Sequence, residues 1–97
     1  MKVIRKDPGQ APAAAEIDNT LEALQEAVGG YIETVSFTDG FCMICNEEGR
    51  LLGLPANGWF FGIHFVGTVL LVGVAGEEFR GLTDDEIRVL ASYMEDD

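Results

Sequence analysis

The run Phe-Val-Gly-Thr-Val-Leu-Leu-Val-Gly-Val, residues 65–74, is the most apolar stretch of the chain. Apolar residues occupy both sets of alternating positions in it, which predicts a strand that is buried on both faces. An exposed edge strand of this composition would pair with other molecules. We therefore expect residues 65–74 to lie at the centre of a sheet, or at an edge that a second copy of the chain covers. The sequence is compatible with a homodimer and with a monomer.

A longer uncharged segment surrounds this run. Residues 51–76 contain no Asp, Glu, Lys or Arg over 26 positions, which is long enough for a membrane-spanning helix. We predict two buried strands and a loop instead, because the segment holds Pro55 and six glycines and no Lys or Arg cluster flanks it. The chain opens with no secretory signal, and its two cysteines are too close together to staple a secreted fold, so we expect a cytoplasmic protein.

The N-terminal third predicts a hairpin followed by a helix. Residues 2–6 and 13–17 flank an Asp-Pro-Gly-Gln turn and are expected to pair. Asn19 has the side chain of an N-cap and Glu22 follows three residues later, so a helix is expected to begin there. Gly29 and the glycine after it predict the end of this helix.

The middle of the chain predicts a meander. Residues 31–37 and 41–46 read as two antiparallel strands, and residues 51–54 as a third strand that follows a tight loop with Gly49 at positive φ. Residues 56–63 combine turn residues with large aromatic side chains and give no single prediction.

The C-terminal segment predicts a second helix. Thr83-Asp84-Asp85-Glu86 is a capping box, and apolar residues follow it at helical spacing: Ile87, Leu90, Ala91 and Met94. With 97 residues the chain makes one domain, residues 1–97. The predicted fold is α+β: a mostly antiparallel sheet in the order β-β-α-β-β-β-β-α, with two helices packed on one face.

Several short motifs together resemble a known family. They are Asn19-Thr20-Leu21-Glu22-Ala23-Leu24-Gln25, Val28-Gly29-Gly30-Tyr31-Ile32-Glu33, Cys45-Asn46-Glu47-Glu48-Gly49-Arg50-Leu51, Gly53-Leu54-Pro55 with Asn57, and Gly67-Thr68 with Val72-Gly73. The chain is similar over nearly its whole length to the domain-of-unknown-function family 3846. The resemblance implies a small protein of a Gram-positive bacterium, a phage or a conjugative element, and it implies no activity.

No residue pattern predicts an enzyme or a metal site. Cys42 and Cys45 have the spacing of a redox or zinc motif, which needs both sulfur atoms on the same side. Residues i and i+3 of a strand point to opposite faces, so a structural role is expected for both cysteines. His64 is the only histidine, so a structural role is expected for it. The sequence contains none of the nucleophile-elbow, zinc-protease, phosphate-loop or dinucleotide motifs. We expect no cofactor, no metal and no catalytic residue.

Charge is the feature that bears most on function. The formal net charge is −11, which disfavours direct binding to nucleic acid or to an anionic membrane. Residues 7–49 hold nine acidic side chains and no Lys or Arg. Five of these acids form the predicted partner-binding surface: Asp18, Glu22, Glu26, Glu47 and Glu48.

Two interpretations of this acidic surface compete. One is a solvated face that keeps the protein soluble. The other is a non-enzymatic interaction module of a phage or mobile genetic element, whose carboxylates imitate DNA phosphates and occupy a host DNA-binding or defence protein. An alternative function is a small-molecule or nucleotide-binding domain, with a site around Asn46, Asn57 and Trp59. In that case the two side-chain amides and the indole would contact a base or a sugar. In the structural alternative, the two Asn are turn residues and Trp59 belongs to the core.

Overall fold

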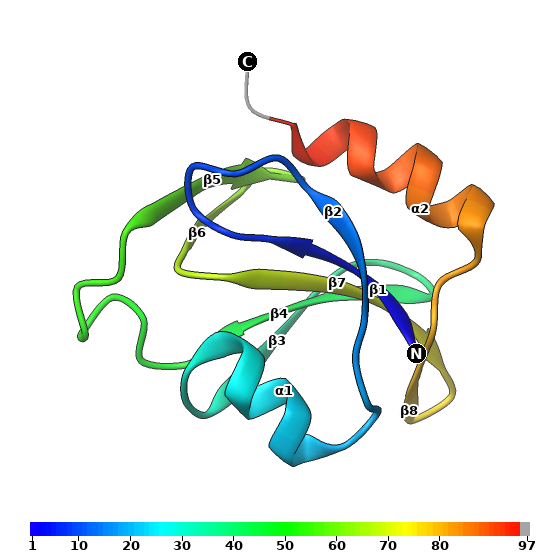
Figure 1. Cartoon of the computed structure of the whole chain (residues 1–97), viewed down its shortest axis with the longest axis horizontal. Helices are drawn as coiled ribbons and strands as arrows, with labels where there is room; N and C mark the ends of the chain where they lie inside the picture. The colour runs from blue at the N-terminus through cyan, green and yellow to red at the C-terminus, as the bar shows by residue number, and fades with distance from the viewer. Residues whose placement is uncertain (96–97) are drawn as a thin grey trace.

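A computed structural model of the chain describes residues 1–95. It is an α+β fold, as predicted, with short helices at either side of a sheet (Figure 1). The elements in chain order are β1 (Lys2–Lys6), β2 (Ala13–Glu16), α1 (Leu21–Val28), β3 (Ile32–Thr38), β4 (Phe41–Asn46), β5 (Ala56–Phe60), β6 (Ile63–Val66), β7 (Val69–Ala75), β8 (Glu78–Arg80), α2 (Asp84–Ala91) and the 3₁₀ turn η1 (Ser92–Met94). No helix in the described part of the chain is both long and apolar enough to cross a membrane.

The main sheet is antiparallel throughout and has β7 at its centre. Its strand order is β2-β1-β7-β4-β3, and β8 pairs with the end of β7. The central position of β7 is the position predicted for the apolar run, and its first five residues, Val69 to Gly73, are buried. The predicted N-terminal hairpin and the predicted pairing of β3 with β4 are also confirmed.

The apolar run itself forms two strands, where the sequence predicted one. β6 ends at Val66 and β7 begins at Val69, and between them Gly67 adopts a φ of 71° that only glycine takes up without strain. β6 pairs with β5 in a separate two-stranded sheet. Residues 56–63, for which the sequence supported no single prediction, therefore belong to a hairpin. Phe61 lies in its turn with a φ of 54°, and the Phe61 ring stacks on the Phe37 ring with 4.1 Å between the ring centroids.

The two helices lie on opposite faces of the main sheet, so the prediction that they share one face is wrong. α1 contributes Leu24 and Val28 to a core formed with Val3, Cys42, Ile44, Leu70 and Val72. α2 and η1 pack with the other core, which is formed by Ile4, Met43, Cys45, Phe60, Phe65, Val69, Leu71, Leu82 and Met94. Apolar residues at both alternating positions of β4 and β7 require cover on both sides of the sheet.

The helix ends follow the predicted capping chemistry, with one shift. Thr83 and Glu86 form the predicted capping box of α2. Gly29 ends α1 in the left-handed conformation, at a φ of 80°. The N-cap of α1 is Thr20 and not Asn19, because the Thr20 hydroxyl accepts a hydrogen bond from the Ala23 amide. The side-chain nitrogen of Asn19 instead donates a hydrogen bond to the Phe79 carbonyl at 2.9 Å.

The predicted strand at residues 51–54 is absent, and residues 47–53 form consecutive turns. The Leu52 amide donates to the Glu48 carbonyl and the Leu54 amide to the Gly49 carbonyl, so these amides are used inside the loop. Gly49 does not have the positive φ that we predicted; a β-carbon there would lie 2.9 Å from a methyl group of Val66. Steric room is therefore what requires glycine at this position.

Candidate interaction surface

The acidic side chains around α1 are exposed, as a binding surface requires. Asp18 lies in the segment that leads into the helix, and Glu22 and Glu26 lie on the helix itself, four residues apart. This spacing places both glutamates on the same side of α1, about 6 Å apart along its axis. Like charges at this spacing destabilise the helix by a few tenths of a kcal/mol, so helix stability does not explain them.

A groove lies between α1 and the β1–β2 hairpin. α1 packs over β3 and β4, and on the same face Ala15 and Ile17 are only partly buried. The groove has a volume of about 530 Å³. Its apolar lining includes Val3, Ala15, Ile17, Ala23, Ala27 and Leu70, and its charged lining consists of Arg5, Glu16, Asp18 and Glu26. Two of the predicted acidic residues, Asp18 and Glu26, therefore line one groove.

The loop after β4 brings Glu48, but not Glu47, near α1. Glu47 and Glu48 are exposed, and Glu48 lines a cavity together with Gln25 and Gly29 at the C-terminal end of the helix. Asn46 fixes this arrangement: its side-chain nitrogen donates to the Val28 carbonyl, and its side-chain oxygen accepts from the Glu48 amide at 2.8 Å. Glu47 instead lines a cavity on the far side of the loop.

Arg5 lines the groove, but it and most of the other basic side chains interact with groups other than the five predicted acids. Lys2 pairs with Asp84, Arg5 with Asp7, Arg80 with Glu86 and Arg88 with Asp85, and Arg50 donates to the His64 carbonyl. Within residues 1–95, the five predicted acids take part in none of these ion pairs. Their negative charge is therefore available to another molecule.

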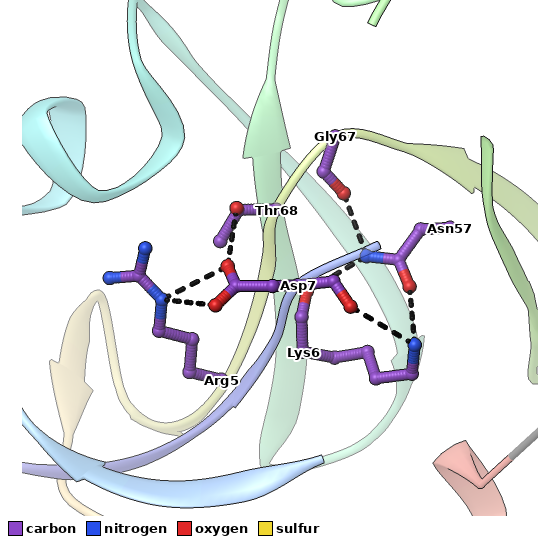
Figure 2. A network of polar contacts seen from close by, with 6 residues as sticks. All are labelled: Arg5, Lys6, Asp7, Asn57, Gly67 and Thr68. Carbon is purple, nitrogen blue, oxygen red and sulfur yellow. Dashed lines mark hydrogen bonds and ion pairs between the residues drawn. The ribbon is translucent and has the colours of Figure 1, made fainter. Parts of the chain in front are cut away.

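The three residues of the alternative ligand site do not gather around a common cavity. Asn46 is engaged as described above. Asn57 is buried in β5 and lies in a polar network with β1 and the β6–β7 junction (Figure 2). Its side-chain nitrogen donates to the carbonyls of Lys6 and Gly67 at 2.8 and 2.7 Å, and its oxygen accepts from the Lys6 ammonium at 3.0 Å. Trp59 is 72% exposed and so does not belong to the core.

The network around Asn57 is a buried feature that no sequence motif indicated. Lys6 is fully buried, and its ammonium also donates to the Asp7 carbonyl and lies 5.9 Å from the centre of the Phe60 ring. Beside it, the Thr68 hydroxyl donates to Asp7 at 2.6 Å (Figure 2). That bond, together with Arg5, lowers the pKa of the Asp7 carboxyl. The network joins β1, β5 and the β6–β7 junction, so Asn57 has a structural role.

A second cavity, of about 390 Å³, lies beside β6. Its polar lining is formed by Glu33, Cys45, Asn46, Glu47, Arg50 and His64. The His64 ring contacts the Trp59 indole, with 5.0 Å between the ring centroids. The Cys45 thiol lies 3.8 Å from a Glu33 carboxylate oxygen, and burial, followed by the Glu33 charge, raises the pKa of this thiol to about 11. A thiol with that pKa is protonated at neutral pH and is a poor nucleophile.

The two cysteines point to opposite faces of β4, as the strand spacing predicted. Cys42 belongs to the core under α1 and Cys45 to the core on the α2 side. They cannot chelate one metal ion from these positions.

The chain belongs to the family whose description is domain of unknown function (DUF3846), and the family model matches residues 1–96. This confirms the resemblance seen in the sequence motifs. No curated protein matches the chain, and no solved structure matches it.

Proposed function

We propose that this protein is a non-enzymatic interaction module that binds a basic, nucleic-acid-binding host protein through the acidic surface around α1. The surface consists of Asp18, Glu22 and Glu26 at α1, and of Glu47 and Glu48 in the loop after β4. The observation that carries the proposal is the groove beside α1, since Asp18 and Glu26 line it together with apolar side chains. A purely solubilising set of charges does not need a groove that brings charged and apolar side chains together.

The chemistry of the surface favours a basic partner. Exposed carboxylates without an ion-pair partner among the described residues attract Lys and Arg side chains, which are the groups that bind DNA phosphates. Carboxylates on a helix are held at fixed spacing, as phosphates are along a strand. The proposed action is to occupy the partner's DNA-binding surface, as a protein of a phage or mobile element would do against a host defence protein.

A pull-down from host lysate at low and at high salt tests the proposal, with mass spectrometry of the retained proteins. The expected result is a nucleic-acid-binding protein that is retained at low salt, released at high salt and displaced by added duplex DNA. The variant E22Q/E26Q/E47Q/E48Q is expected to lose this capture. It should keep its fold, because all four side chains are exposed.

A matched control separates this surface from overall charge. The variant D39N/E77Q/E78Q/E95Q removes the same number of charges from exposed positions outside the acidic surface. It is expected to retain the partner. Equal loss of capture in both variants, or the absence of any nucleic-acid-binding protein at low salt, would contradict the proposal.

The small-molecule alternative has one observation in its favour, the cavity beside Asn46 and His64. It is tested by extraction of the purified protein and analysis of the extract for nucleotides. A nucleotide held in stoichiometric amount would replace the interaction module as the proposed function, and substitution of Trp59 would then weaken its binding more than the four Glu changes do.

A further inference from the structure

β2 is an edge strand of the main sheet. Hydrogen-bonded and non-hydrogen-bonded residue pairs alternate along its ladder with β1, and this alternation identifies which backbone groups of β2 face outward. Met1 and Ile17 exchange two hydrogen bonds, because the Met1 nitrogen donates to the Ile17 carbonyl at 2.7 Å and the Ile17 amide donates to the Met1 carbonyl at 3.0 Å. In an antiparallel pair, residues that exchange bonds alternate with residues that do not. The register pairs Val3 with Ala15, and Ile4 with Ala14.

It follows that Ala15 bonds to β1, whereas the amide and carbonyl groups of Ala14 and Glu16 point away from the sheet. Both residues are exposed. Within residues 1–95, no backbone hydrogen bond outside the β1–β2 ladder involves either of them. Ala14 and Glu16 therefore present the free donors and acceptors to which an added strand pairs.

The edge borders the groove beside α1. Ala15, Glu16, Ile17 and Asp18 line this groove, with Glu26 on the helix opposite. On the other face of the sheet, Ala14 and Glu16 border a small cavity with Ile87 and the Lys2–Asp84 ion pair. An extended segment paired with β2 would therefore place one set of alternating side chains in the acidic groove and the other set near α2.

We propose that the occupant of this edge is an extended basic segment of a partner protein, which adds as a strand to β2 and places its Lys or Arg side chains toward Asp18 and Glu26. This rests on the proposed function and specifies how the partner binds. The charge of the groove selects the occupant. A second copy of this chain would bring its own Glu16 and Asp18 to the same edge, and a membrane surface with anionic lipids would be repelled.

The proposal is tested with a synthetic peptide, an acetylated and amidated hexapeptide of alternating lysine and valine. Its binding to the isotope-labelled protein is followed by amide chemical shifts and hydrogen exchange. The expected shifts lie in β2 and along the groove. The exchange of the Ala14 and Glu16 amides should slow roughly tenfold at a peptide concentration about ten times Kd.

Two controls isolate strand pairing from charge attraction. The same peptide with its strand-pairing amides N-methylated keeps its charge and is expected to bind at least about tenfold more weakly. The variant A14P removes one outward N–H at an edge position where proline is tolerated, and it is expected to weaken binding of the unmodified peptide. A11P, in the exposed loop before β2, is the matched proline control and is expected to bind like the unchanged protein.

Several results would overturn the proposal. Equal binding of both peptides, or unchanged binding by A14P, would show charge attraction without strand pairing. Self-association that A14P abolishes would assign the edge to a second copy. If A14P still captures the lysate partner while E22Q/E26Q/E47Q/E48Q does not, strand addition fails and the proposed function stands. If no basic protein is captured at all, the proposed function fails, and the peptide titration still decides whether the edge accepts a strand.

Discussion

Replacement of Asn57 by alanine tests whether this residue holds the fold together or binds a ligand. Its side chain is buried and makes three hydrogen bonds, two to the backbone carbonyls of Lys6 and Gly67 and one from the Lys6 ammonium. Asn57→Ala removes all three. The two carbonyls then lose a buried donor, and the ammonium loses one of its acceptors.

The magnitude follows from these contacts. A buried polar group left without its partner costs about 1–3 kcal/mol, and a hydrogen bond to a charged group contributes about 1.5–3 kcal/mol. Allowing for relaxation of the site, we expect Asn57→Ala to lower the free energy of unfolding by about 3–5 kcal/mol. In a domain of this size each kcal/mol corresponds to roughly 4–8 °C in Tm, so the melting temperature should fall by at least about 12 °C.

Urea unfolding followed by far-ultraviolet circular dichroism measures the effect. Asn19→Ala is the matched control, because the Asn19 amide is exposed and makes one hydrogen bond, to the Phe79 carbonyl. We expect it to cost about 0.5–1.5 kcal/mol. A stability of Asn57→Ala within about 1 kcal/mol of the unchanged protein, or an equal loss in Asn19→Ala, would contradict a structural role for Asn57.

Three further predictions concern the caps and the cysteines. The hydrogen bond and charge of Arg80 and the Thr83 amide hold the pKa of Glu86 at about 2, below its ordinary 4.5, so its contribution to stability is complete above pH 4.5 and is lost as the pH falls toward 2. The variant E86Q should therefore be less stable at neutral pH and show a flatter acid dependence in thermal melts; an unchanged pH profile would contradict this. A β-carbon at Gly29 would have no atom within 4 Å, but the residue has a φ of 80°, so Gly29→Ala should lower the free energy of unfolding by about 1–2 kcal/mol in chemical denaturation. An unchanged free energy would refute backbone strain as the reason for glycine. Because burial raises the pKa of both thiols, Cys42 and Cys45 should react with a thiol reagent only on unfolding, and replacing both with alanine should lower stability without changing metal content; stoichiometric zinc in the purified protein would count against a structural role.

The sequence predicted the structure correctly at positions where a few neighbouring residues determine it. The capping box at Thr83, the glycine that ends α1 and the apolar centre of the sheet each depend on the chemistry of a few neighbouring side chains. The shift from Asn19 to Thr20 shows the limit of this reasoning. Both side chains can cap a helix, and the choice depends on the Phe79 carbonyl, which is distant in sequence.

The errors arose where tertiary contacts decide. The two helices cover the two apolar faces of β4 and β7, and which face each helix covers depends on contacts between segments that are distant in sequence. The turns at residues 47–53 are set by hydrogen bonds inside the loop and by close packing of Gly49 on Val66. The buried ammonium of Lys6 was not predictable, because its acceptor on Asn57 lies 51 residues away.

The candidate surface was predictable as charge and not as shape. The spacing of the acids along the chain identified the exposed side of α1, whereas the groove depends on how far the helix covers the sheet. The free edge of β2 likewise follows from strand order, which residue patterns do not encode.

The salt dependence of the captured partner's affinity decides whether the acidic surface binds a basic protein. Kd is measured by titration at increasing sodium chloride for the unchanged protein, for E22Q/E26Q/E47Q/E48Q and for D39N/E77Q/E78Q/E95Q. We expect affinity to fall steeply with salt for the unchanged protein and the control, and we expect the variant with the four Glu changes to bind weakly with little salt dependence. An affinity of the unchanged protein that stays constant from low to high salt would contradict this expectation.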